Sequence, residues 1–134
     1  MRSRAKGPFD VKLTPQSNDA PAEGSPLGRM SISKEYRGDL MGTGVGEMLT
    51  AGTAVPGSAA YVAVERVTGT LGGRTGTFAL QHTGTMTRGE PHLVISVVPD
   101  SGTGELLGLD GTMNIIIANG AHSYEFDYRV AGTR

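Results

Sequence analysis

The sequence has no cysteine and no tryptophan, and aromatic residues make up only 5% of it. The absence of cysteine excludes disulfides, thiolate metal sites and cysteine nucleophiles, and it leaves the redox compartment open. A formal net charge of -1 offers no electrostatic footprint for nucleic acid or an anionic membrane. No apolar run approaches the roughly 20 residues that span a bilayer. We therefore expect neither nucleic-acid nor membrane partners.

The basic start of the chain, MRSRAKGPFDVK, is not followed by an apolar segment, so we expect no secretory signal and a cytoplasmic location. A length of 134 residues suits one domain, spanning 1–134. Short alternating runs among 21 glycines indicate an all-β domain with many turns. We expect residues 1–6 to form an N-terminal tail. Residues 15–27, rich in proline and serine, are expected to form a mobile loop.

Two alternating runs meet at Gly72-Gly73 within residues 60–86, AYVAVERVTGTLGGRTGTFALQHTGTM. Such a two-residue turn tolerates positive φ and predicts a tight hairpin in which Leu71 faces Arg74. One face is then mainly apolar, whereas the other carries mostly threonine, as a solvated face does. The apolar face includes two ionisable side chains, Glu65 and His82. They are diagonal neighbours, about 7–8 Å apart at the backbone and within side-chain reach.

A second hairpin turns at Asn119-Gly120, a strong hairpin signal, and its register places Phe126 inside and Glu125 outside. The turn-rich segment from Pro99 to Asp110 contains Leu106, Leu107 and Leu109, and we expect a short helical turn within it to bury them and plug one end of the fold. Further alternating runs bring the count to eight strands. We predict a closed eight-stranded antiparallel up-and-down barrel, which has no free edges, with a β-sandwich as the alternative. Eight strands leave room for packed side chains or one small ligand.

The register of residues 29–50 depends on the turn at Gly38-Asp39. A two-residue turn would place Glu47 on the apolar face with Lys34 and Tyr36, whereas a three-residue turn would move Glu47 to the other face. Lys34 stands on the otherwise apolar side of its strand, so we expect it at the rim, with its ammonium in water. Glycines at every second position from 42 to 46 leave one face bare, where a bulky group comes close.

Two strings, YVAVERVTGTLGGRTGTFALQHTGTM and SGTGELLGLDGTM, resemble a bacterial family of short proteins described as a domain of unknown function. The resemblance extends from about Phe9 to Val130 and includes KEYRGDLMGTGVGEML. It implies a calycin-like barrel, similar to allene oxide cyclase, lipocalin and streptavidin barrels, and a homodimer. It implies no established activity, because a shared fold does not determine function.

Glu65 and His82 are the candidate catalytic pair, because a carboxylate beside an imidazole in an apolar enclosure can transfer a proton. The same pair could equally satisfy itself and serve only the structure. Scattered histidines and the absence of cysteine predict no metal and no cofactor. The inward side chains expected to bind a ligand are Tyr36, Glu47, Tyr61, Phe78, His122 and Tyr124.

Three functions remain open from the sequence. The first is a barrel that binds a small apolar or amphipathic molecule around Glu65 and His82. The second is an isomerase or cyclase in which this pair transfers a proton. The third is a filled barrel that acts through its outer surface, where Val62, Val64 and Ile116 could contribute to a dimer contact.

Overall fold

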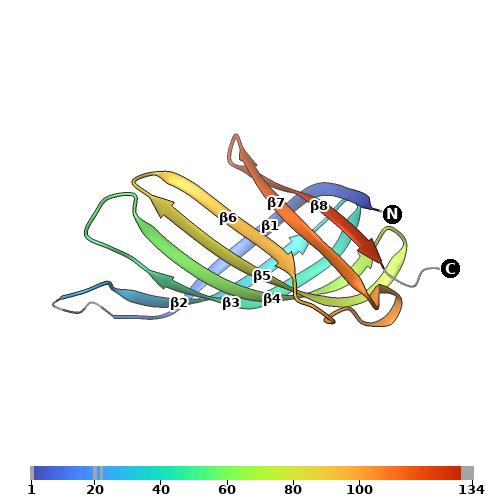
Figure 1. Cartoon of the computed structure of the whole chain (residues 1–134), viewed down its shortest axis with the longest axis horizontal. Coiled ribbons are helices and arrows are strands. Elements are labelled where there is room, and N and C mark those ends of the chain that lie inside the picture. Colours follow the sequence, from blue (N-terminus) through green and yellow to red (C-terminus); the bar gives the residue numbers. More distant parts are fainter. Residues whose placement is uncertain (1, 20, 22, 131–134) are drawn as a thin grey trace.

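The computed structural model describes residues 2–19, 21 and 23–130, and it is a closed antiparallel barrel in which each strand pairs with the next and the last pairs with the first (Figure 1). The described residues contain no helix long and apolar enough to cross a membrane. The elements are β1 (Ser3–Asn18), β2 (Leu27–Tyr36), β3 (Leu40–Ala51), β4 (Ala59–Leu71), β5 (Arg74–Thr87), β6 (Glu90–Val97), the 3-10 helix η1 (Gly104–Leu106), β7 (Leu109–Ala118) and β8 (Ala121–Val130).

Both predicted hairpins are confirmed in register. In the β4–β5 hairpin, Leu71 pairs with Arg74, and both turn glycines have positive φ. In the β7–β8 hairpin, Phe126 is fully buried, whereas Glu125 is half-buried and lies beside Arg4. Local turn chemistry therefore sets the inside and outside of these four strands.

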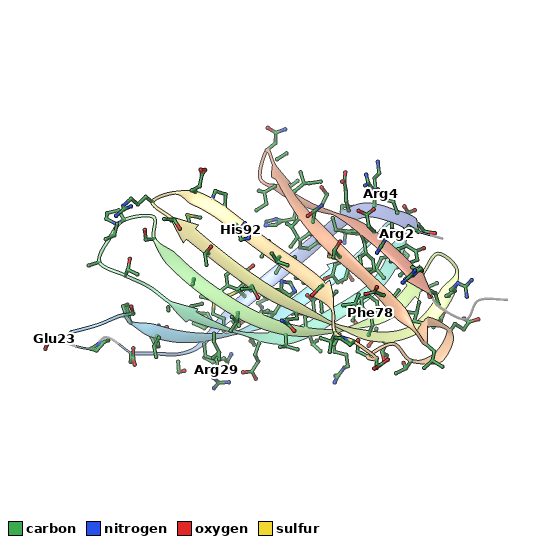
Figure 2. The ribbon with its side chains drawn as sticks, viewed as in Figure 1. Arg2, Arg4, Glu23, Arg29, Phe78 and His92 are labelled. Atoms are coloured by element: carbon green, nitrogen blue, oxygen red, sulfur yellow. The ribbon has the colours of Figure 1, made fainter. Side chains whose placement is uncertain are left out.

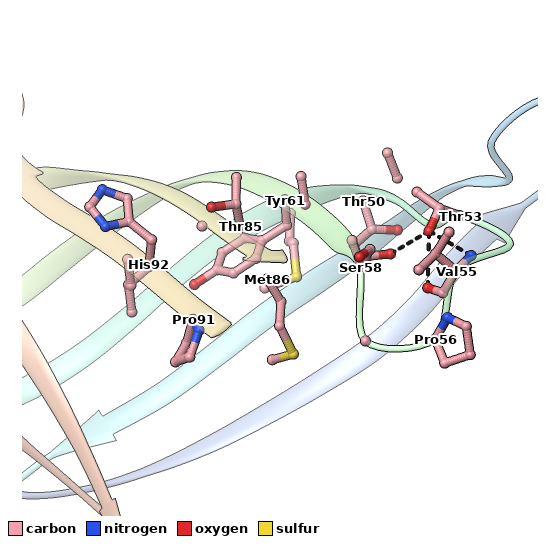
Figure 3. A pocket seen from close by; sticks show the side chains of 18 of the residues that line it. Thr50, Thr53, Val55, Pro56, Ser58, Tyr61, Thr85, Met86, Pro91 and His92 are labelled. Carbon is pink, nitrogen blue, oxygen red and sulfur yellow. Dashed lines mark hydrogen bonds between the residues drawn. The ribbon is translucent and has the colours of Figure 1, made fainter. Parts of the chain in front are cut away.

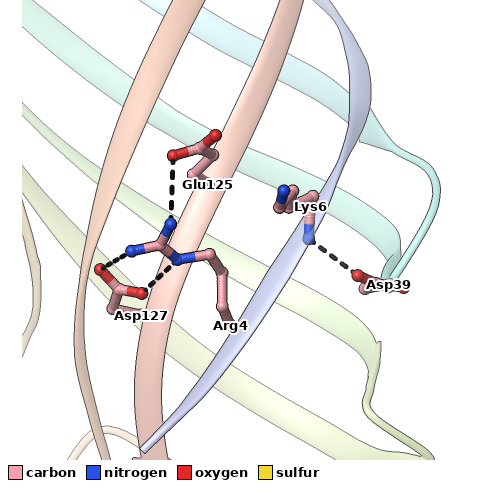
Figure 4. Close-up of polar contacts among 5 residues, drawn as sticks. All are labelled: Arg4, Lys6, Asp39, Glu125 and Asp127. Atoms are coloured by element: carbon pink, nitrogen blue, oxygen red, sulfur yellow. Dashed lines mark hydrogen bonds and ion pairs between the residues drawn. The ribbon is translucent and has the colours of Figure 1, made fainter.

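The first strand is longer than predicted at its start, because residues 3–6, expected as a tail, pair with β8. Two residues, Arg4 and Lys6, hold this segment through their contacts (Figure 4). The Arg4 guanidinium lies 2.8 Å from the Asp127 carboxylate and 3.8 Å from that of Glu125. The Lys6 main-chain N–H donates to the Asp39 carboxylate at 2.9 Å. These long-range partners are what turns the expected tail into a strand.

The first strand is also longer at its far end, where residues 15–18, expected in a loop, remain paired with β2. A bulge between Pro15 and Ser17 accommodates the proline, which has no N–H to donate. Asp19 then closes the connection. Its main-chain N–H donates to the Leu27 carbonyl at 2.8 Å, and its carboxylate accepts from the Leu27 N–H at 2.7 Å. Residues 20 and 22 of the predicted loop lie outside the described residues.

The β2–β3 connection is one residue longer than the two-residue turn, so the placement of Glu47 on the inner face is wrong. Tyr36 pairs with Gly42, which directs the glycines of β3 inward and Glu47 outward. The reason lies in β8: the Tyr124 hydroxyl donates to the Arg37 carbonyl at 2.7 Å and accepts from the Leu40 N–H at 2.8 Å. Tyr124 thereby holds Leu40 inside the barrel.

One end of the barrel is filled. Leu106 of η1 is fully buried there, as predicted for a plug, although its neighbour Leu107 is exposed. The rings of Phe78 and Phe126 stack with centroids 5.8 Å apart. Arg4 and Arg29, in contrast, extend outside the barrel (Figure 2). We call the filled end of the barrel the closed end. Its buried side chains include Leu40, Leu71, Phe78, Leu80, Leu106, Leu109 and Phe126.

Candidate functional site

The other end of the barrel, the open end, holds a cavity of about 690 Å³. Its walls come from β3, the loop 52–58, the starts of β4 and β6, and the ends of β5 and β7. Tyr61, Met86 and Pro91 extend into the same space in Figure 3. The lining residues are Met48, Thr50, Ala51, Gly52, Thr53, Val55, Pro56, Gly57, Ser58, Ala59, Ala60, Tyr61, Gly84, Thr85, Met86, Pro91, His92, Leu93 and Ile117.

The described residues that line the cavity include no aspartate, glutamate, lysine or arginine. Its polar groups are hydroxyls together with His92 at the rim. Tyr61, predicted to line a cavity, lies in it; burial raises the pKa of this phenol, so it remains a neutral donor. Its ring lies over Gly84, where an added Cβ would come within 2.5 Å of the ring. In the described part of the chain, no group hydrogen-bonds to the Tyr61 hydroxyl, which is therefore available to a ligand.

The loop 52–58 forms a fixed wall of this cavity. The Thr53 hydroxyl donates to the Ser58 carbonyl at 2.7 Å (Figure 3). The loop is also bound to the β5–β6 turn, because the Gly89 N–H donates to the Gly57 carbonyl and the Arg88 N–H to the Ser58 hydroxyl, both at 2.9 Å. Sequence reasoning left this loop without a role. The alanines at 59 and 60, small residues beside it, are the only signal that space remains there.

A buried ionic cluster lies deeper in the barrel, centred on Glu65. One carboxylate oxygen of Glu65, Oε1, accepts from Lys34 Nζ at 3.0 Å and lies 2.9 Å from His82 Nε2. The other, Oε2, accepts a short hydrogen bond from the Tyr36 hydroxyl. Lys34 Nζ also lies 5.2 Å from the centre of the Phe9 ring. The predicted pair of Glu65 and His82 is thus in contact, within a cluster of four side chains.

The charges of this cluster are balanced by its own members. Burial alone raises the pKa of Glu65, and it is the largest single influence. The hydrogen bond from His82, the charge of Lys34 and the hydrogen bond from Tyr36 together outweigh it, and they hold the pKa of Glu65 below its ordinary value. Burial and the neighbouring carboxylate raise the pKa of Tyr36. The cluster therefore contains a carboxylate, an ammonium and a neutral phenol.

Gly44 of β3 makes room for the cluster. A Cβ at this position would clash with Glu65 Oε2 and come within 3.2 Å of the Tyr36 ring. Lys34 belongs to the cluster, so its expected place at the solvent-exposed rim is wrong. The glycines at every second position of β3 signalled a bulky neighbour. They could not identify Glu65 and Lys34, which reach this point from strands on either side.

The cluster and the cavity are separate. Met48 pairs with Ala63, and Ala63 pairs with His82, so His82 lies at the same depth as the floor of the cavity. Glu65 lies one inward position deeper and is 0% exposed. Neither Glu65 nor His82 contributes to the cavity lining. A molecule in the cavity would therefore contact Tyr61 but not the Glu65 carboxylate.

The remaining predicted ligand-binding residues are dispersed. Phe78 and Tyr124 are buried at the closed end, and Tyr36 belongs to the ionic cluster. His122 lies inside, with its ring 5.4 Å from that of Phe9. Glu47 lies on the outer surface and pairs with Arg29 at 2.9 Å. Among the described residues, no group of three or more potential metal ligands comes together.

Comparison with known proteins identifies a family of unknown function and a solved structure from that family. Residues 5–128 match the family described as "Protein of unknown function (DUF3224)". A crystal structure of a protein with unknown function from the DUF3224 family of Shewanella oneidensis MR-1 is 51% identical. The match covers 99% of this chain and 100% of that chain, with a TM-score of 0.93. Comparison with curated proteins gives no match.

Proposed function

The chain belongs to the DUF3224 family, whose function is unknown, and we propose that it binds a small, uncharged, largely apolar molecule in the cavity at its open end. One observation carries this proposal. An apolar cavity of about 690 Å³ contains a tyrosine hydroxyl that no described residue hydrogen-bonds. This volume lies within the range of about 300–1,000 Å³ that is usual for small-molecule sites.

The chemistry of the lining supports the ligand class. A charged group in this cavity would lose its hydration without gaining an ionic partner within the walls, since the described residues that line them include no carboxylate, lysine or arginine and the one histidine, His92, lies at the rim. An apolar body would instead contact Met48, Met86 and Ile117. A carbonyl or hydroxyl on that body would bind the Tyr61 phenol, which can both donate and accept.

The test is binding of the neutral fluorescent probe N-phenyl-1-naphthylamine. We expect saturable fluorescence enhancement with the wild-type protein, and about 0.5–1.5 kcal/mol weaker binding, up to about tenfold in Kd, for Tyr61→Phe. The matched control is Tyr128→Phe, because Tyr128 lies near the closed end, where its hydroxyl approaches the Gly72 turn. Absence of saturable binding to the wild type, with the fold intact by circular dichroism, would reject the proposal.

The alternative of an isomerase or cyclase using Glu65 and His82 stays a prediction. In its favour, the carboxylate and imidazole are in contact, one level below the cavity. Against it, every oxygen of the Glu65 carboxylate already has a partner, and the side chain is fully buried. We therefore favour binding over catalysis, with the cluster supporting the floor of the site.

A further inference from the structure

The barrel wall is incomplete between β6 and β7. Only two residue pairs join these strands, Ile95 with Met113 and Ser96 with Thr112, whereas thirteen join β4 and β5. Beyond Ile95, the same register would pair Leu93 with Ile115 and Pro91 with Ile117, but the strands have separated by then. Figure 1 shows the β7–β8 hairpin diverging from β6 toward the open end. We call this gap the β6–β7 seam.

The pleat of the sheet shows which main-chain groups face the seam. In the β5–β6 hairpin, the two-residue turn Arg88-Gly89 makes Thr87 and Glu90 a hydrogen-bonded pair, and such pairs then alternate. The Val98 N–H donates to the Ala79 carbonyl at 2.9 Å, which agrees with this alternation. Odd-numbered residues of β6 therefore direct their N–H and C=O groups away from β5 and toward β7.

The same alternation holds in β7, where the Asn119-Gly120 turn directs the main chain of Ile115 and Ile117 away from β8 and toward β6. In the described part of the chain, Leu93, Ile115 and Ile117 have no ladder partner on the seam side. Pro91, which lacks an N–H, stands on this edge, as is usual for proline in sheets. The seam therefore has free main-chain donors and acceptors.

The seam opens onto the cavity. Leu93 and Ile117 line the cavity from its two sides, and they are 38% and 66% exposed. From β3 to β6 the wall is continuous, because these strands are fully laddered and the loop 52–58 is hydrogen-bonded to the β5–β6 turn. The seam is thus an unladdered side of the site.

We propose that the ligand enters through the β6–β7 seam and remains lying across it. Its apolar body occupies the cavity under Tyr61, and an uncharged carbonyl, amide or hydroxyl group binds the free main-chain groups of Leu93, Ile115 and Ile117. This inference rests on the proposed function and adds a route and a ligand class: elongated neutral amphiphiles. Charged analogues are excluded, because the described lining has no carboxylate, lysine or arginine side chain to supply a counter-charge.

The experiment bridges the seam. Since the chain has no native cysteine, Leu93→Cys/Ile115→Cys can be joined by a bis-maleimide without side reactions, and without requiring disulfide geometry. Stopped-flow fluorescence then follows association of N-phenyl-1-naphthylamine. We expect the association rate to fall about tenfold or more on bridging, because docking would then require an opening step. The reference for this comparison is the same double variant before cross-linking, so that only the bridge differs.

Two controls make the result specific. The same reagent on Thr70→Cys/Thr75→Cys bridges a laddered pair near the closed end, where the two hydroxyls lie 2.9 Å apart, and should leave the rate unchanged. Ile117→Trp, at an exposed position, narrows the seam without a cross-link and should also slow association. The anionic probe 8-anilinonaphthalene-1-sulfonate should bind at least tenfold more weakly than the neutral one.

The outcomes separate the two proposals. Saturable binding at an unchanged rate after bridging overturns the seam route and leaves the cavity as the binding site. Equal affinity for the anionic probe overturns the ligand class. If the wild-type protein does not bind the neutral probe, the proposed function fails, and the seam inference fails with it.

Discussion

At the scale of single residues, Glu65 is a side chain held on all sides by its neighbours. It is fully buried and receives hydrogen bonds or charge from Lys34, Tyr36 and His82. A buried ion pair contributes little net stability compared with apolar packing, but the loss of one partner is costly because the other charge is left unpaired. The main contribution of Glu65 to stability is therefore that it neutralises the buried ammonium of Lys34.

We expect Glu65→Gln to destabilise the fold by about 3–5 kcal/mol at neutral pH, because it leaves the Lys34 ammonium buried without a counter-charge. Urea unfolding measures this loss. The matched control is Glu47→Gln, which removes an exposed partner of Arg29 and should cost under about 1 kcal/mol. Equal losses in the two variants would contradict a buried ionic cluster.

The wild-type protein and Glu65→Gln should also differ in how their stability depends on pH. The pKa of folded Glu65 lies below its value in the unfolded chain, so its contribution is complete above the unfolded pKa and is lost as the pH falls through the folded pKa. Wild-type stability should therefore fall below about pH 4.5, and this fall should be smaller in Glu65→Gln. Parallel acid profiles for the two proteins would mean that Glu65 is not ionised in the fold.

At the scale of elements, β3 is shaped by its glycines. Gly42, Gly44 and Gly46 face inward, and Gly42 and Gly46 approach the backbone of β4 so closely that any Cβ there would clash with a carbonyl. Gly44 instead faces the Glu65 carboxylate. Because these inward positions have no side chains, the strand can lie close to β4 and leave space for the ionic cluster.

We expect Gly44→Ala to destabilise the protein by about 1–3 kcal/mol, as overpacking does, because the new methyl group displaces the Glu65 carboxylate from Tyr36. Gly52→Ala is the control, since a Cβ there meets only a proline side chain, at 3.3 Å, and should change stability by under about 0.5 kcal/mol. Unfolding midpoints in urea compare the two. An unaffected Gly44→Ala protein would show that the carboxylate has room to move.

At the scale of the whole molecule, the barrel is filled at one end and hollow at the other. The closed end holds the aromatic stack of Phe78 and Phe126 beneath Leu106, whereas the open end holds the cavity and the seam. Such a division predicts unequal local stability, since opening needs least free energy where ladders are short and apolar packing is sparse.

Hydrogen exchange measured by NMR should reveal this division. We expect the amides of Leu93, Ile115 and Ile117 to exchange at least 100-fold faster than those of Val67 and Leu80, which lie in the fully laddered β4 and β5. Strong protection of the three seam amides would show that β6 and β7 are paired in solution. That result would also remove the basis for a lateral route into the cavity.

The homodimer implied by the family resemblance stays a prediction. The outer face of β3 and β4 exposes Leu49, Val62 and Val64 beside a shallow groove of about 440 Å³. Large exposed apolar patches commonly mark contacts between proteins. This face is therefore the first to examine if sedimentation shows two copies.

The sequence alone determined the strand count, the barrel and two hairpin registers. Gly72-Gly73 and Asn119-Gly120 act through local backbone geometry, so the contact between Glu65 and His82 followed from counting residues away from a turn. The register between β2 and β3 could not be found in this way. Tyr124, which belongs to β8, holds that connection through its hydroxyl, and no local pattern reports a partner so distant in the chain.

Tertiary structure alone decided what lies inside the barrel. Alternation shows which side chains point inward, but whether they fill the space depends on how eight strands meet and where the ladders end. Lys34 reaches Glu65 because Gly44 stands between them without a side chain, and the wall beside the cavity is open where β7 leaves β6 after two pairs. Both features depend on contacts between strands that are far apart in the sequence. The periodicity of a single strand carries no information about such contacts.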